Sequence, residues 1–402
     1  MSWRKYLIIL AMALAPACGA VAADRPIKIG VMNDMSGVYA DYQGIGSVIA
    51  ARLAVKDFGG HLDGRPITVI AGDHQNKVDI GTGMARQWFD RDGVDAIFDV
   101  PNSAIGLAVS DIAREKNKVF VASGAVTSEL TGKRCSPNTV QWTFDNWSLA
   151  HGLVQSVIAT GGDTWFFLTS DYAFGHNLEA AASAAVKHYG GKVLGSVRHP
   201  LGTSDFSSFI LQAQASKAKV IALANAGGDT TNAVKQAAEF GVGKHGQRLA
   251  GLVFGLNNVH ALGLKAAQGL LAVSPFYWNM NAGTRAFAKR FQALHPKKAM
   301  PNEMQAGVYA AVLHYLKAVK ALGGDTTGDK VVAKMKELPT DDPLFGKGRI
   351  RIDGRTLHPM YLLQVKSPAE SKEDWDYFKV MYKIPADKAF RPLKDGGCPL
   401  VK

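Results

Sequence analysis

Polar and aromatic residues gather in five stretches of the chain, each directly after a short β-branched run that is typical of a strand. The stretches span residues 33–42, 101–103, 123–127, 170–175 and 225–229. Open α/β sheets bind ligands just beyond the carboxyl ends of their strands. Hydroxyl, amide and aromatic groups at such positions favour the binding of a small molecule. Each stretch taken alone is also what an ordinary turn or helix cap requires.

The second stretch opens a predicted helix. Asn102 or Ser103 is a natural N-cap, and the helix that follows offers free N–H groups and the positive end of its dipole to an anion. Tyr42, Tyr172 and Phe174 could contact a ligand or pack against the protein.

Three further aromatic residues lie where the chain is predicted to cross between two halves of the molecule. Trp147 follows the first crossing, and Phe276 and Tyr277 lie at the second. Aromatic residues at such places either line a cleft or brace the crossing. Both interpretations stay open.

Motifs of catalysis and of metal or phosphate binding are absent from the sequence. It contains no H-E-x-x-H, no C-x-x-C and no close pair among its eleven histidines. It also lacks G-x-S-x-G and the P-loop, and no G-x-G-x-x-G follows the first predicted strand. We therefore predict no metal site and no cofactor, and a nucleotide enzyme is disfavoured. We expect no enzymatic activity, and a Ser/His/Asp site assembled only in the folded chain stays open as the alternative.

The composition is that of an ordinary soluble protein of more than one domain. The chain has 402 residues, 47% hydrophobic and 20% charged, with a net charge of +12. Its basic residues are scattered, with no run of five or more. The sequence therefore predicts no nucleic-acid partner in spite of the positive charge.

The first residues have the parts of a secretory signal peptide. A basic start precedes about ten apolar residues, and Ala20–Ala22 supplies an A-x-A cleavage site. We predict that residues 1–22 are a signal peptide and that the mature chain has no transmembrane segment. Lipidation of Cys18 is the alternative. Removal of the segment leaves Cys135 and Cys398, which in an exported chain favour one disulfide over two free thiols.

Strands and helices alternate along the chain in two similar series, as in parallel sheets covered on both faces. In the first series we predict strands 27–32, 67–71, 96–100 and 119–122 and helices 44–58, 78–91 and 103–116. In the second we predict strands 164–169, 192–197, 220–225 and 249–254 and helices 175–189, 206–216 and 230–240.

The last third of the chain reads as helices 283–294, 303–322 and 330–338 and strands 349–352, 360–365 and 378–382. Too few strands remain for an independent sheet, so we expect these elements to complete the two lobes already begun. Lobe 1 is predicted to comprise 24–144 and 277–348, and lobe 2 to comprise 145–276 and 349–402. The chain must then cross between the lobes three times.

Several short motifs in a fixed order carry a family resemblance. They are IKIGV at 27–31 leading to MSG at 35–37, AVKD at 54–57, SDIA at 110–113, SGAVTSEL at 123–130, DYAFG at 171–175 and DFS at 205–207. The chain resembles type 1 periplasmic substrate-binding proteins of the branched-chain amino-acid ABC transporter family, over nearly all of the mature sequence.

The resemblance implies an α/β fold of the periplasmic binding protein type I class, with two doubly wound parallel-sheet lobes joined by three hinge crossovers. It implies a monomer in the periplasm that closes on a small carboxylate and docks on an inner-membrane ABC permease with its ATPase. Two alternatives are an exported ligand sensor for a signalling partner and, less favoured, a secreted hydrolase.

The resemblance also transfers ligand contacts. The family's ligand-binding serine falls on Ser103, its next loop on residues 124–126, and its two aromatic contacts on Tyr42 and Phe174. Amino-acid binders usually have threonine where Val126 stands, and Thr127 is displaced by one. The full predicted set is Tyr42, Asn102, Ser103, Gly124, Ala125, Val126, Thr127, Trp147, Tyr172, Phe174, Asn225, Asp229, Phe276 and Tyr277.

One departure bears on the ligand. The acid that holds the ligand ammonium in amino-acid binders has no clear match in residues 253–260, and Asp229 is an uncertain substitute. A site with anion-binding groups and no ammonium partner favours a carboxylate without an α-amino group. Together with the aromatic residues, this gives the hypothesis of an aromatic carboxylate.

Overall fold

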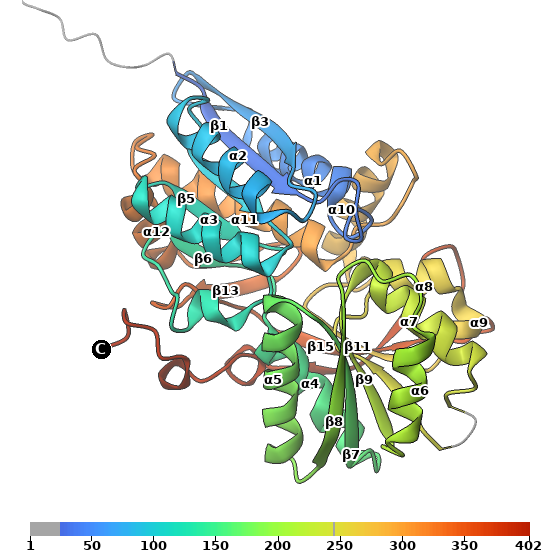
Figure 1. Ribbon diagram of the computed structural model, residues 1–402. Helices are drawn as coiled ribbons and strands as arrows, with labels where there is room; N and C mark the ends of the chain where they lie inside the picture. Colours follow the sequence, from blue (N-terminus) through green and yellow to red (C-terminus); the bar gives the residue numbers. More distant parts are fainter. Residues whose placement is uncertain (1–24, 244–245) are drawn as a thin grey trace, which may run out of the picture.

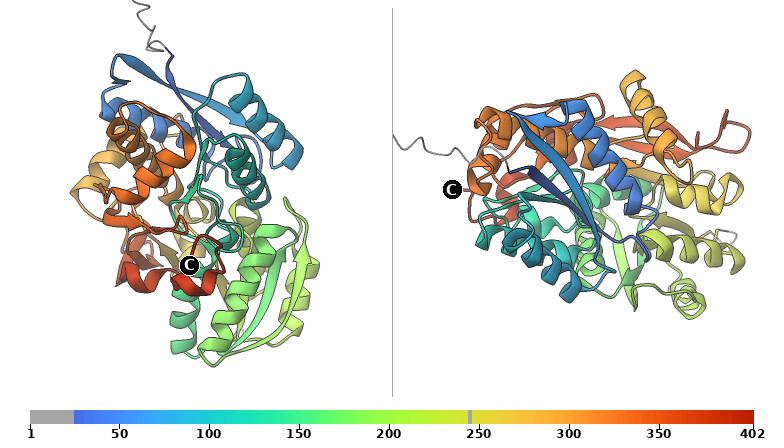
Figure 2. Two further views of the ribbon diagram at one scale, coloured as in Figure 1. Left: turned by 90° about the vertical axis from the view of Figure 1, so that its left-hand side faces the viewer. Right: turned by 90° about the horizontal axis from the view of Figure 1, so that it is seen from above.

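The computed structural model describes residues 25–243 and 246–402 (Figure 1). The predicted signal peptide and Cys18 lie outside the described residues. Two lobes lie one above the other in Figure 1, and the C-terminus lies beside their junction (Figure 2). In the part of the chain that is described, no helix is long and apolar enough to cross a membrane.

The first lobe is built on a six-stranded sheet in which every pair except β2–β3 is parallel. Its strand order is β2 (His61–Leu62), β3 (Arg65–Asp73), β1 (Ile27–Asn33), β4 (Ala96–Asp99), β5 (Val119–Ala122) and β6 (Thr139–Gln141). Helices cover both faces of this sheet, and β1, β4 and β5 are therefore buried on both sides. The helices are α1 (Gly44–Phe58), α2 (Val78–Asp90), α3 (Ser103–Glu115), α10 (Ala282–Leu294), α11 (Glu303–Ala321) and α12 (Gly328–Glu337).

The second lobe is built on a four-stranded parallel sheet. Its order is β10 (Arg248–Gly251), β9 (Val220–Ala224), β7 (Thr164–Ser170) and β8 (Lys192–His199). The central strand β9 is buried throughout, whereas the edge strand β8 alternates between exposed and partly buried residues. The helices are α4 (Asn146–Ala159), α5 (Ala173–His188), α6 (Ser207–Ala215), α7 (Gly227–Glu239), α8 (Leu256–Leu262) and α9 (Leu264–Ala267).

The last strands pair differently from the prediction. Instead of completing the parallel sheets, they form two three-stranded antiparallel sheets. One is β11 (Leu271–Ser274), β15 (Met360–Val365) and β16 (Phe378–Ile384), and the other is β12 (Thr340–Asp342), β13 (Gly346–Ile350) and β14 (Thr356–Leu357). The prediction that too few strands remain for an independent sheet is therefore wrong. Short connections such as the turn between β12 and β13 allow antiparallel pairing, whereas parallel pairs need a long crossover.

The β11–β15–β16 sheet lies against the second lobe. A side chain at Gly152 of α4 would lie 3.0 Å from Val273 of β11 and 3.2 Å from Ile384 of β16. After β16 the chain runs through α13 (Ala386–Ala389) and the 3₁₀ helix η2 (Leu393–Gly396). A second 3₁₀ helix, η1 (Ser128–Thr131), lies in the first lobe and contacts η2.

Most predicted elements form within a residue or two of their expected ends, and α1 matches exactly. Two boundaries differ in the second lobe. Helix α7 begins at Gly227, three residues early, and its N-cap Ala226 has no capping side chain that would have marked the start. Strand β10 ends at Gly251, three residues early, and Val253 after it lines the pocket between the lobes.

Candidate functional site

A pocket lies between the lobes, lined by the segments that follow the strands of both sheets. The first lobe contributes residues after β1, β4 and β5, and the second contributes residues after β7, β9 and β10. The lining residues are Tyr39, Tyr42, Gln43, Pro101, Gly124, Val126 and Met304 from the first lobe and Tyr172, Phe174, Ala226 and Val253 from the second. The carboxyl edges of two parallel sheets thus face each other across the pocket. Open α/β sheets bind their ligands at this edge.

Side chains fill most of the pocket in this conformation. The remaining space admits only a water molecule or two, so anything larger enters when the lobes move apart. The structure therefore represents a closed arrangement of the walls.

Direct hydrogen bonds join the lobes around the pocket. The Tyr39 and Tyr172 hydroxyls lie 2.6 Å apart, and burial raises the pKa of both. The Gly228 N–H donates to the carbonyl of Val38 at 3.0 Å. The Tyr42 hydroxyl donates to the side-chain oxygen of Asn258. These contacts stabilise the closed arrangement.

The first-lobe wall rests on a network of buried side chains. Asp34 accepts hydrogen bonds from the backbone of Gly37 at 2.7 Å and of Tyr39 at 2.9 Å. The Asn33 amide donates to Asp99 Oδ2 at 3.1 Å and to the Gly44 carbonyl at 3.0 Å. The loop that carries Tyr39 is thereby fixed to the end of β1.

The turn after β4 is strained. Asp99 and Val100 have positive φ values of 84° and 54°. Such a backbone conformation is unfavourable for residues other than glycine, and most of all for a β-branched residue such as Val100. Burial raises the pKa of Asp99 to about 7. A side chain at Gly124 would lie 2.9 Å from both Asp99 Oδ1 and Pro101 Cα, so this wall has room only for glycine.

Five of the fourteen predicted ligand-binding residues line the pocket: Tyr42, Gly124, Val126, Tyr172 and Phe174. Two more lie directly beside it, after the lining residue Pro101. Asn102 caps α3 by accepting from the N–H groups of Ala104 at 3.0 Å and Ile105 at 3.2 Å. Ser103 is fully buried, and its hydroxyl has no hydrogen-bond partner among the described residues.

Two other predicted residues support the pocket wall from behind. Ala125 is buried beside Gly106 of α3, where a side chain would lie 2.8 Å from its Cβ. Thr127 caps η1 by accepting from the N–H of Glu129 at 3.3 Å. Their carbonyls both accept from the Gln141 amide, which holds the loop against β6.

Three second-lobe predictions lie outside the pocket lining. Trp147 stacks on His151 of the same helix with ring centroids 3.9 Å apart. Asn225 accepts from the Thr230 hydroxyl at 2.7 Å. Asp229 accepts from the N–H of Gly202 at 3.2 Å, and burial raises its pKa to about 7.

Phe276 and Tyr277 lie in a separate buried cluster. The Tyr277 hydroxyl donates to Asp376 at 3.2 Å, and Phe276 packs edge-on against Phe287. Of the two interpretations left open by the sequence, this packing matches bracing of the chain crossing. The cluster lines a different small cavity, beside the buried carboxyl of Glu303, whose pKa burial raises to about 7.

Six pocket residues were not predicted from the sequence: Tyr39, Gln43, Pro101, Ala226, Val253 and Met304. Tyr39 belongs to the first polar and aromatic stretch, so its position carried a signal. Met304 stands in an alanine-rich helix and carried none. Among the described residues, no group of three or more His, Cys, Asp or Glu side chains is placed to hold a metal ion.

Comparisons with known proteins agree in the class of protein they point to. The model of the family described as "Periplasmic binding protein" matches residues 26–372. A periplasmic binding protein from Burkholderia mallei is 50% identical, with a TM-score of 0.91, covering 94% of this chain and 99% of its own. A branched-chain amino acid ABC transporter periplasmic ligand-binding protein from Burkholderia xenovorans is 41% identical, with a TM-score of 0.82, covering 94% and 100%.

More distant relatives match over nearly the whole chain. A solute-binding protein of an ABC transporter from R. palustris, solved in complex with benzoate, has a TM-score of 0.81 at 22% identity, covering 93% of this chain and 99% of its own. The Leu/Ile/Val-binding protein homolog 6 of Brucella melitensis is 23% identical over 93% of this chain and 96% of its own length.

Proposed function

The chain belongs to the periplasmic binding protein family, and from this premise we propose that it is the solute-binding component of an ABC importer. It binds a small carboxylate between its lobes and delivers it to an inner-membrane permease with its ATPase. The observation that carries the proposal is the pocket whose walls come from the strand ends of both lobes. Such a pocket changes shape when the lobes move, so ligand binding and closure are coupled.

The chemistry of the pocket favours an aromatic carboxylate. Tyr39, Tyr42, Tyr172 and Phe174 surround it with aromatic surface, which stacks well on a flat ring. Of the described residues that line it, none is an acid that would hold an α-ammonium group. Ser103, with its unpartnered hydroxyl at the start of α3, supplies a donor for a carboxylate.

The relatives point to two ligand classes. One similar protein binds benzoate, as stated of its crystal structure, and another is described as belonging to a branched-chain amino acid transporter. The aromatic walls favour the first ligand, and an aliphatic amino acid remains the second candidate. For either, we propose a periplasmic monomer from which residues 1–22 have been removed.

Binding assays on ligand-stripped mature protein test the proposal. Benzoate and cinnamate are expected to raise the melting temperature and to bind by calorimetry, and leucine and valine are not. Cyclohexanecarboxylate keeps the carboxylate without the aromatic ring, and benzamide keeps the ring without the charge. Both are expected to bind at least tenfold more weakly than benzoate. Stabilisation by leucine or valine alone would overturn the aromatic assignment.

Recovery of the ligand separates binding from turnover. Mass spectrometry of the bound compound after prolonged incubation is expected to return it unchanged. A converted product would overturn the proposal of a binding protein and favour the hydrolase that the sequence left as an alternative.

A further inference from the structure

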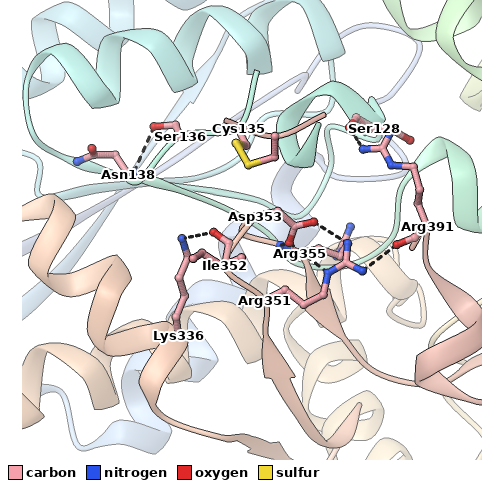
Figure 3. Close-up of a disulfide and its surroundings, with 11 residues drawn as sticks. Ser128, Cys135, Ser136, Asn138, Lys336, Arg351, Ile352, Asp353, Arg355 and Arg391 are labelled. Atoms are coloured by element: carbon pink, nitrogen blue, oxygen red, sulfur yellow. Dashed lines mark hydrogen bonds and ion pairs between the residues drawn. A yellow bond between two sulfur atoms is a disulfide. The ribbon is translucent and has the colours of Figure 1, made fainter. Parts of the chain in front are cut away.

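The C-terminal segment passes from one lobe to the other and is bonded there. It leaves β16, which lies in the sheet packed on α4 of the second lobe, and ends near η1 of the first lobe. The structure pairs Cys398 with Cys135, with Cα atoms 5.6 Å apart and a sequence separation of 263 (Figure 3). We call residues 385–398 the tail.

Two residues anchor the tail before it reaches the disulfide. Phe390 is buried, and the guanidinium of Arg355 lies 4.7 Å from its ring centroid. Arg391 donates from Nη2 to the carbonyl of Ser128 at 2.9 Å, and its own carbonyl accepts from Arg351 at 2.7 Å (Figure 3). The tail is therefore held by specific contacts along its length.

Ser128 is the point at which the tail, the pocket loop and the second lobe meet. Its N–H donates to Asn177 of α5 at 3.1 Å, and its hydroxyl accepts from the N–H of Trp147 of α4 at 3.1 Å. It directly follows residues 124–127, which include two pocket-lining residues. Within that loop, the carbonyl of Val126 accepts from the N–H of Asn146 at 2.7 Å.

We infer that the tail is a fourth connection between the lobes, in which Arg391 and the Cys135–Cys398 disulfide position the pocket loop 124–127 and limit how far the lobes separate. Arg391 acts through Ser128 and is a positioning residue. The carbonyl of Ser128, the residue directly after the loop, is where Arg391 binds.

The disulfide and the anchors have different parts in this arrangement. Cys398 lies fourteen positions after Ile384, and this stretch fully extended would span roughly 45 Å, so the disulfide alone restricts opening little. Opening is limited because the tail stays folded on Phe390 and Arg391. The disulfide keeps a detached tail close to its site, so that the contacts re-form as an intramolecular step.

Hydrogen exchange on the ligand-free, disulfide-bonded protein tests the inference without any ligand. In R391A, amides of residues 124–131 are expected to exchange at least tenfold faster than in the wild type, while those of β1 are unchanged. R86A is the matched control, because Arg86 forms an exposed ion pair with Glu115 in the same lobe and is remote from the tail. R86A is expected to leave both segments unchanged.

A second experiment tests the contribution of the Cys135–Cys398 disulfide. Reduction of the folded wild type with a phosphine, and independently the C135S/C398S variant, are expected to increase the radius of gyration in small-angle scattering and to weaken benzoate binding three- to tenfold. Reduction of the native protein avoids dependence on whether the double variant folds.

The outcomes separate a positioning role from mere stabilisation. A lower melting temperature with an unchanged radius of gyration, and with exchange in 124–131 and benzoate affinity within twofold of wild type, would overturn the inference. Because the inference rests on the proposed function only for the benzoate measurement, absence of benzoate binding in the wild type would contradict that function. The exchange and scattering results would still decide the role of the tail.

Discussion

The two walls of the interlobe pocket are built in different ways. The first-lobe wall is fixed from behind by the Asp34 and Asn33 hydrogen bonds, by the strained turn at Asp99 and by a glycine that nothing larger can replace. The second-lobe wall presents Tyr172 and Phe174 at the start of α5 and Ala226 before α7, and neither helix has a capping side chain.

For the proposed function, this difference assigns a separate task to each wall. A wall held by buried polar contacts and strain keeps its shape whether the lobes are open or closed, and so can select the ligand. A wall of aromatic surface whose hydrogen bonds reach across to the other lobe gains these contacts on closure. We therefore expect changes in the first wall to affect selection and stability, and changes in the second to affect closure.

The buried acids of the two lobes give the largest expected effect. Burial raises the pKa of Asp99 and of Asp229 to about 7, whereas an unfolded aspartate titrates near 4. Between these values the unfolded chain releases a proton that the folded protein keeps, so each group lowers the free energy of unfolding as pH rises from 4 to 7. D99N removes the pH dependence that Asp99 contributes. The free energy of unfolding of D99N minus that of wild type should therefore rise by about 3 kcal/mol between pH 4 and pH 7.

Denaturant titrations of D99N and D229N at pH 4, 5, 6 and 7 measure this change. His74, His151 and His358, whose pKa values burial lowers to about 4, give the opposite slope but are common to all variants and cancel in the differences. Each variant is expected to lose only the contribution of its own carboxyl group to the slope. Only D99N is expected to change ligand affinity, because Asp99 lies against the pocket wall at Gly124. If D229N lost ligand affinity and D99N did not, the second lobe and not the first would select the ligand.

Glycine-to-alanine changes compare the space behind the two walls. G124A places a methyl group 2.9 Å from Asp99 and Pro101, and we expect it to cost about 2 kcal/mol of stability and to weaken ligand binding at least tenfold. G228A is the matched change in the second lobe, where the nearest atoms, those of Val38, lie 3.8 Å away. Thermal unfolding and calorimetry on both variants decide the matter, and equal effects would show that the walls are equally rigid.

The fold was largely predictable because its signal is local. Buried parallel strands such as β9 are continuous apolar runs, and helices such as α1 have their own periodicity, so both appear in the sequence without knowledge of their neighbours. The pairing of β15 with β11 and β16 depends on contacts between distant segments, and no local pattern encodes it.

The site was predictable only in part, for the same reason. Tyr42, Tyr172 and Phe174 follow strands in conspicuous polar stretches, whereas Met304 and Val253 reach the pocket as ordinary apolar residues of elements far away in sequence. Phe276 and Tyr277 looked equally conspicuous but are turned into a cluster with Phe287 and Asp376. Residue type marks a candidate, and the packing of the whole chain decides where it points.

Ser103 tests whether the first wall selects the carboxylate. Because its buried hydroxyl has no partner among the described residues, S103A should leave the free energy of unfolding nearly unchanged. It should weaken carboxylate binding by roughly 1–3 kcal/mol through loss of a charge-assisted hydrogen bond. Ser110 of the same helix bonds to Thr139 at 2.8 Å, so S110A should show the reverse pattern, with lower stability and unchanged affinity. Unchanged carboxylate affinity of S103A by calorimetry would remove Ser103 from the site.

The smallest expected effect comes from the hydroxyl groups of Tyr39 and Tyr172, which join the two walls by a hydrogen bond. The 2.6 Å contact exists only when the lobes are together, so it adds to the stability of the closed state and nothing to the open one. Y39F or Y172F is expected to cost about 1 kcal/mol of ligand affinity, the usual net value of such a bond. Since each single change already breaks the contact, Y39F/Y172F should cost little more than either alone, and a double-mutant cycle measures that coupling. Additive losses would mean that each hydroxyl contacts the ligand separately, and closure would then depend on the ligand and not on the pair.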